Sequence, residues 1–95
     1  MVNSFLQYIQ YEKKYSSCTV FSYQNDIYQF QEFLSENYSI SIEQTDLKHI
    51  RNWIIQLKQD NIKSSSVNRK ISALKSLFKY GLKYNHIKTN PCLKL

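Results

Sequence analysis

The apolar positions of the chain recur every three or four residues in four separate segments, which is the spacing of one face of an α-helix. The pattern predicts four helices, over about residues 3–14, 17–37, 46–60 and 64–84. Asn3 or Ser4 is expected to cap the first helix, and Thr45 or Asp46 the third. Asn61 is expected to end the third helix. Because the connections are short, we expect a compact all-α four-helix bundle with one core.

The second and fourth segments carry the longest apolar stripes. In the second segment the stripe consists of Val20, Tyr23, Ile27, Phe30 and Leu34. In the fourth segment it consists of Val67, Ile71, Leu74, Phe78 and Leu82. Residues 38–44 lack helical spacing and predict a loop held down by Ile40 and Ile42. Residues 86–91 predict a turn, because Pro91 cannot continue a helix.

The fourth segment has a polar arc opposite its apolar stripe. Seven residues lie on that arc, namely Asn68, Arg69, Ser72, Lys75, Ser76, Lys79 and Lys83. At its start, the hydroxyls of Ser64, Ser65 and Ser66 are expected to cap the helix or to donate to phosphate oxygens near the unpaired backbone N–H groups. Lys70 falls at the edge of the apolar stripe, from which a long side chain can reach solvent. An apolar stripe opposite a basic polar arc favours contact of the arc with a nucleic-acid backbone. The alternative is that the arc is a charged face that contacts only solvent.

Charge is concentrated in the second half of the chain. Through Leu47 the chain has two basic residues and six acidic ones, whereas from Lys48 onward it has eleven basic residues and Asp60 as the only acid. The net charge is +6. A field concentrated in one half attracts a polyanion to one side of the fold. A soluble basic domain without a nucleic-acid partner is the competing interpretation.

Composition narrows the possible classes further. A chain of 95 residues predicts one small domain, and its single glycine and single proline disfavour hairpins and phosphate-binding loops. Cys18 and Cys92 lie far apart without a metal-ligand spacing, so we expect no disulfide, zinc site or other cofactor. No apolar run approaches the roughly 18 residues of a membrane span. No signal pattern follows Met1, so we expect a cytoplasmic protein without a membrane partner.

Two blocks of residues and a boundary motif stand in the order and spacing of a known family. The first block contains Tyr15-Ser16-Ser17, Thr19, Tyr23, Asp26, Phe30 and Phe33-Leu34. The second contains Ile50-Arg51, Trp53, Leu57, Ser64 and the run from Ser66 to Tyr80. Asn90-Pro91 closes the match. The chain, from Phe5 to Pro91, resembles the core-binding domain of tyrosine recombinases of the Xer and phage-integrase type.

The resemblance implies a SAM-like helical domain that forms half of a C-shaped clamp on double-stranded DNA during integration, excision or chromosome dimer resolution. The second and fourth helices would lie across the major groove, and the first-helix region would contact other protomers of a tetramer. The implicated residues are Ser16, Thr19 and Ser22 on the second helix and Ser64, Ser65, Ser66, Asn68, Arg69, Ser72 and Lys75 on the fourth. From the polar arc we add Lys79 as a phosphate contact. The isolated domain is expected to be a monomer.

The resemblance also implies that this chain carries no catalytic residue. The family joins a tyrosine covalently to the DNA phosphate, with an arginine pair, histidines and a lysine stabilising that phosphate. The only arginines here are Arg51 and Arg69 and the only histidines are His49 and His86, and the match explains all four by other roles. We therefore expect the catalytic tyrosine to lie beyond Leu95. Residues 1–88 are then the binding domain, and residues 89–95 begin a linker to a catalytic domain.

Two other classes of protein remain open. A helix-turn-helix regulator would also bind DNA, although the long fourth helix lacks the short preceding helix and the glycine-containing turn of that motif. A protein-interaction bundle would instead dock a partner helix on exposed aromatics such as Phe21 and Tyr28. Salt-sensitive binding to duplex DNA separates the first two classes from the third.

Overall fold

The computed structural model describes every residue of the chain except Lys94. Helix α1 (Val2–Gln7) runs directly into a π-helical segment, η1 (Tyr8–Glu12). Helix α2 (Ser17–Tyr38) is followed by a 3-10 turn, η2 (Ile42–Gln44). Helices α3 (Leu47–Gln59) and α4 (Ser64–Lys83) complete the fold, and no strand occurs among the described residues. The predicted all-α class is confirmed.

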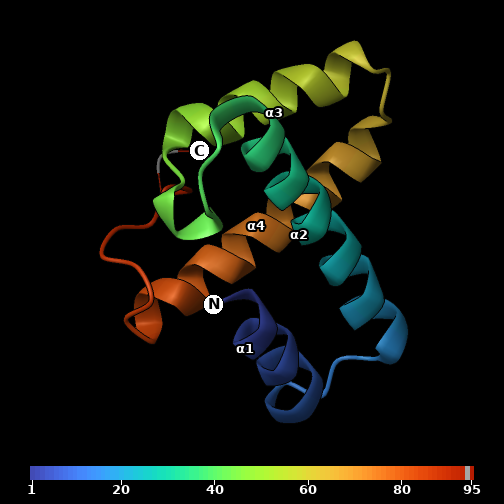
Figure 1. Ribbon diagram of the computed structural model, residues 1–95. Coiled ribbons are helices and arrows are strands. Elements are labelled where there is room, and N and C mark those ends of the chain that lie inside the picture. The colour runs from blue at the N-terminus through green and yellow to red at the C-terminus, as the bar shows by residue number, and fades with distance from the viewer. Residues whose placement is uncertain (94) are drawn as a thin grey trace.

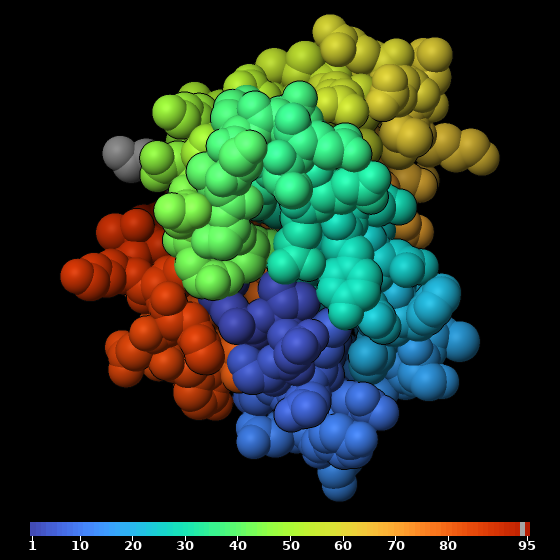
Figure 2. All heavy atoms as spheres, viewed as in Figure 1, coloured from blue at the N-terminus to red at the C-terminus, as the bar shows by residue number. Residues whose placement is uncertain are grey.

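The helices pack around α4, which crosses behind α2 in Figure 1. Helix α3 closes one end of the molecule against α2 and α4, and α1 packs against the same two helices at the other end. Figure 2 shows the atoms of α1 seated between those of α2 and the C-terminal segment. This arrangement leaves one long side of α4 uncovered.

Two helix ends, at Asp46 and Asn61, follow the predicted local chemistry, and the cap at Ser16 was not predicted. Ser16 precedes α2, and its Oγ accepts a hydrogen bond from the backbone N–H of Thr19 at 3.2 Å. Asp46 precedes α3 as predicted. Beyond the end of α3, Asn61 has a left-handed backbone with φ of 61°, which asparagine tolerates better than most residues. The predicted cap of α1 is wrong. Met1 precedes the helix, whereas Asn3 and Ser4 lie within it.

The core is formed by the predicted stripes with one correction on α4. Nine large apolar side chains are less than 2% exposed among the described residues: Phe5, Phe30, Phe78, Ile9, Ile27, Leu34, Ile50, Leu74 and Leu77. Leu82, expected on the stripe, is 41% exposed. The buried side continues instead through Gly81, where an added Cβ would meet the side chains of Met1 and Ile87. A glycine has no side chain to mark the apolar pattern, so the sequence could not place this turn of the helix.

The first helix is not continuous over residues 3–14 as expected. Within η1 the backbone hydrogen bonds join residues that are five apart instead of four. For example, the backbone N–H of Lys13 donates to the carbonyl of Tyr8 at 3.1 Å. Lys14 then takes a left-handed conformation, with φ of 54°. The backbone N–H of Tyr15 closes the turn by donating to the carbonyl of Ile9 at 2.9 Å. The spacing of apolar residues in the sequence does not indicate a π-helical turn of this kind.

The segment after α4 folds back onto the core. Oδ1 of Asn90 accepts a hydrogen bond from the backbone N–H of Cys92 at 2.8 Å, and the Cys92 side chain is buried. Burial raises the pKa of the Cys92 thiol to about 11, which keeps it protonated.

The domain boundary at residue 88 stays a prediction. Among the described residues, none of the helices has the length and apolar character needed to cross a bilayer.

His49 makes the stability of α3 depend on pH. Its Nδ1 accepts a hydrogen bond from the backbone N–H of Asp46 at 2.9 Å, which requires a neutral ring. Burial, followed by the charge of Lys48, lowers the pKa of His49. The unfolded chain therefore binds this proton at higher pH than the folded chain does. Stability should be complete above the ordinary histidine pKa of about 6.5 and should fall as the pH drops below it.

Thermal melts at pH 7.5 and at successively lower pH should show this loss. Glutamine at the same position keeps an acceptor for the Asp46 N–H but cannot titrate. His49→Gln is therefore expected to show a smaller fall of the melting temperature over that range. An equal fall in both proteins would assign the dependence to another group.

Candidate nucleic-acid interface

A buried carboxylate joins α2 to α4. Asp26 of α2 is fully buried, and its two oxygens accept hydrogen bonds from Nε and Nη2 of Arg69, both at 3.0 Å. Nζ of Lys70 donates to the same carboxylate at 2.9 Å and also to Oε1 of Gln29. Lys70 was expected at the edge of the apolar stripe, but it is buried and its ammonium group stays inside the protein. One acid thus holds two neighbouring cations of α4.

Arg69 is held at the edge of this cluster with its guanidinium partly in solvent. Half of its side-chain surface is exposed, against 1% for Asp26. The hydrogen bonds and charge of Asp26 raise the pKa of Arg69, which therefore stays cationic. A guanidinium has five N–H donors, and the remaining ones point away from the carboxylate. The side chain is thus fixed in direction while it keeps donors for an external acceptor.

Further along α4, the polar arc faces solvent as predicted. Asn68, Ser72, Lys75 and Lys79 follow one another at helical spacing, and all four are exposed. Ser76 on the same arc is partly buried. Helix α4 contains no acidic residue, so the charged side chains on this arc are all basic. Its lysines can neutralise phosphates, and its serine and asparagine side chains can hydrogen-bond to sugar, phosphate or base edges.

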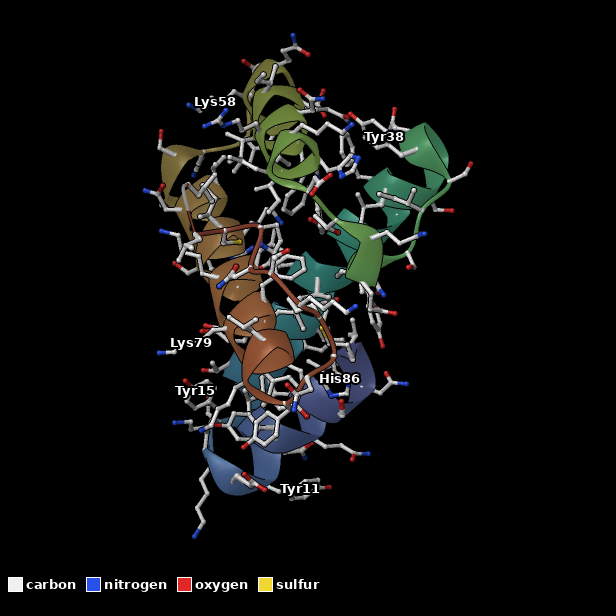
Figure 3. All side chains as sticks on the ribbon, turned by 90° about the vertical axis from the view of Figure 1, so that its left-hand side faces the viewer. Tyr11, Tyr15, Tyr38, Lys58, Lys79 and His86 are labelled. Atoms are coloured by element: carbon white, nitrogen blue, oxygen red, sulfur yellow. The ribbon has the colours of Figure 1, made fainter. Side chains whose placement is uncertain are left out.

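The connection that leads into α2 approaches the second half of α4. Tyr15, just before α2, lines the same hollow as Ser76 and Lys79. Figure 3 shows Tyr15 and Lys79 on one side of the molecule and Tyr38 on the opposite side. Thr19 and Ser22 precede Asp26 by seven and four residues, so they lie on the same face of α2 as Asp26. Asp26 and Arg69 join the two helices, and the placement of the other predicted residues on one DNA surface stays a prediction.

The serines at the start of α4 do not cap the helix. Lys63 occupies the capping position without a side-chain hydrogen bond, and Ser64, Ser65 and Ser66 form the first helical turn. Ser64 and Ser65 are exposed, and Ser66 is partly buried. The extended backbone at Lys63 places the helix start one residue earlier than a serine cap would require. Of the hydroxyls expected to bind phosphate, that of Ser16 caps α2 and lies 2.9 Å from the Thr19 hydroxyl.

Asp26 and Gln29 were not predicted as part of the site. Asp26 was visible as one residue of the matched first block, but its partners stand 43 and 44 residues further along the chain. Sequence spacing cannot connect residues at that separation. Gln29 gave no signal beyond its place on the polar side of the second helix.

Comparison with known proteins agrees with this arrangement. The phage integrase N-terminal SAM-like domain family matches residues 2–84, so the chain belongs to that family. The chain is 37% identical over 87 residues to the tyrosine recombinase XerC of Listeria innocua, an alignment that covers 92% of the chain. It is 30% identical over 94 residues to the tyrosine recombinase XerD of Rickettsia bellii, which covers 99% of the chain.

The alignments also show how much of these relatives the chain represents. They cover 29% of the Listeria protein and 30% of the Rickettsia protein. A third relative, the tyrosine recombinase XerC of Anoxybacillus flavithermus, is 33% identical over 90 residues, covering 95% of the chain and 30% of the relative. The chain thus spans less than a third of the length of these curated relatives. No solved structure matches it.

Proposed function

We propose that this chain is the DNA-binding domain of a site-specific tyrosine recombinase and that the α2–α4 edge lies on duplex DNA. The observation that carries the proposal is the polar arc of α4, which has lysines and no acidic residue and is bordered by Arg69, whose guanidinium is held by Asp26. Phosphate contacts would supply affinity and position. The XerC and XerD relatives support the recombinase class.

The residues take distinct roles in this proposal. Lys75 and Lys79 neutralise backbone phosphates, and the start of α2, with Ser16, Thr19 and Ser22, adds hydroxyl donors. The exposed first turn of α4 presents its backbone N–H groups and the side chains of Ser64 and Ser65 to a phosphate. Asn68 and Ser72 are placed to meet base edges or sugars. Asp26 takes Nε–H and one N–H of Nη2 of Arg69, so the three remaining donors on Nη1 and Nη2 are left for a phosphate or a base edge.

The whole protein would cut and rejoin DNA with groups outside this chain. We place its catalytic tyrosine in another domain and expect the reaction to be integration, excision or chromosome dimer resolution. Its partners would be duplex DNA and other protomers of a recombinase tetramer, with the α1 region contributing protomer contacts. We expect it to act in the cytoplasm, where bacterial DNA is found.

Binding of the 95-residue chain to duplex DNA should fall steeply with salt. Each phosphate neutralised by a lysine or arginine contributes a slope of about −0.9 in a plot of log affinity against log salt concentration. Lys75→Gln should weaken binding to matched and scrambled duplexes alike and reduce the magnitude of that slope by about one. Fluorescence anisotropy at several salt concentrations measures both quantities.

Lys48→Gln is the matched control, because Lys48 is an exposed lysine on α3, away from the basic arc of α4. It should leave the slope unchanged. Equal effects of Lys48→Gln and Lys75→Gln would indicate that only net charge matters. A response independent of salt in the unaltered chain would contradict the proposal altogether.

A further inference from the structure

A hollow of about 240 Å³ lies where η1, the α1–α2 connection and the last turns of α4 meet. Its walls combine cations with aromatic rings, including Lys13, Lys79, Lys83, Tyr8, Tyr15 and Tyr84. We call this the lysine–tyrosine pocket. No carboxylate is among the described residues that line it. Three positive charges therefore converge on one small concave surface without a neutralising partner.

The aromatic wall of the pocket is a packed cluster. Ring centroids lie 5.0 Å apart for Tyr8 and Tyr80 and 4.8 Å apart for Tyr80 and Tyr84, and the Tyr8 and Tyr84 rings approach to 5.8 Å. Contacts of this kind restrain ring orientation. Two of the three ammonium groups lie over rings of this wall, with Lys13 Nζ at 5.8 Å from the Tyr8 ring centre and Lys83 Nζ at 5.5 Å from that of Tyr84.

The π-helical segment builds one side of the pocket. An ordinary α-helical turn would carry Lys13 onward along the helix, whereas the wide turn bonds its backbone N–H to the carbonyl of Tyr8. The left-handed residue Lys14 then turns the chain so that Tyr15 also faces the hollow. Isolated π-helical turns are rare and occur frequently at functional sites. This feature is independent of the charges that surround the pocket.

The chemistry of the walls selects an anion with several acceptor oxygens. Ammonium groups only donate hydrogen bonds, and a tyrosine hydroxyl can donate as well. Among the described residues, the hydroxyls of Tyr8, Tyr15 and Tyr84 form no hydrogen bond to another residue, and none is a buried unpaired atom. The volume lies below the roughly 300 Å³ at which pockets for organic ligands begin. A phosphate group fits these conditions.

We propose that the lysine–tyrosine pocket binds a phosphate of the DNA backbone outside the α2–α4 edge. This inference rests on the proposed function, because Ser76, Lys79 and Lys83 belong both to the pocket and to the arc of α4 that we place on DNA. Figure 3 shows Tyr15 of the pocket on the same side of the molecule as Lys79 of the arc. The pocket extends the DNA-binding surface onto the α1–α2 connection and couples it to η1.

A matched pair of variants tests the proposal. Among the described residues that line the pocket, Lys13 is the lysine that lies off the arc of α4, so Lys13→Gln removes a charge that belongs to the pocket alone, whereas Lys14→Gln removes the charge of the neighbouring exposed lysine, which does not line the pocket. Binding to a scrambled duplex is measured against salt for both variants and for the unaltered chain. The pocket variant should reduce the magnitude of the salt slope by about one, and the control should leave it unchanged.

The outcomes separate this inference from the proposed function. Equal slopes for Lys13→Gln and Lys14→Gln, with a steep slope for the unaltered chain, would overturn the pocket and leave the proposed function standing. A flat response of the unaltered chain would overturn both.

Ring-proton resonances of Tyr8 and Tyr84 in the unaltered chain give a readout that needs no variant. They should shift on addition of duplex and stay in place with inorganic phosphate alone at the same phosphate concentration. Saturable shifts with inorganic phosphate alone would overturn the assignment to the DNA backbone, and no shift with duplex would overturn the pocket.

Discussion

Asp26→Asn is expected to destabilise the domain by about 3–5 kcal/mol, the usual cost of removing one partner from a buried ion pair. Asparagine keeps the shape of the side chain but leaves the buried ammonium of Lys70 without a counter-charge. The carboxylate is 1% exposed and Lys70 is 7% exposed at the side chain, so water cannot replace the lost partner. Urea denaturation with an unchanged m-value measures the loss.

A second variant separates the charge from the packing. Lys70→Met combined with Asp26→Asn removes both buried charges, so it should recover much of the stability lost in Asp26→Asn alone. Arg69 remains half exposed and can be solvated. If the double variant is less stable than Asp26→Asn, then Lys70 stabilises the fold through contacts other than its ion pair.

The same cluster changes what Arg69→Ala tests. A freely solvated Arg69 could be removed without cost to the fold, but here its loss removes two hydrogen bonds to a buried carboxylate. Lys70 still neutralises Asp26 in that variant, so its effect on stability should be smaller than that of Asp26→Asn. DNA binding by Arg69→Ala therefore has to be measured at a temperature where the variant is fully folded.

Leu74→Ala is expected to destabilise the domain by about 2–5 kcal/mol, because it leaves a cavity in the centre of the core. Leu74 is fully buried on the side of α4 that faces the other helices. Leu82→Ala is the matched control, since the same truncation at a 41% exposed position should change stability by about 0.5 kcal/mol or less. Urea denaturation of both variants compares them directly.

This pair also tests the orientation of α4. The apolar pattern alone assigns Leu74 and Leu82 to one stripe, whereas the structure separates them. Similar large losses for both variants would mean that the last turn of α4 is rotated toward the core. The basic arc on its opposite side would then be rotated as well.

Local chemistry explains how much of the fold was predictable. The bounds of α2, α3 and α4 fall within one or two residues of those expected, because each helix has an apolar stripe and polar residues at its ends. Asn61 was recognised as the end of α3 because asparagine tolerates the left-handed backbone conformation better than most residue types do. The π-helical turn at η1 and the capping position at Lys63 were missed, because backbone hydrogen bonding and not residue type decides them.

The candidate interface was predictable to the same extent. The polar arc of α4 and the concentration of charge after Lys48 are visible in the sequence, and the role of the α2 hydroxyls stays a prediction from the family resemblance. The restraint on Arg69 and the pocket beside Tyr15 were not visible. Both depend on residues that come together only when α1 and α2 pack against α4.

The sequence by itself determined four helices, their apolar stripes and a basic arc, because periodicity and charge are properties of each segment taken alone. The tertiary structure decided which edge of each helix meets which neighbour. Packing turned Leu82 outward, buried Lys70 against Asp26 and brought Lys13 toward Lys83. These outcomes depend on where helices cross, and the crossing minimises the exposed apolar surface of the whole chain while every buried charge keeps a partner.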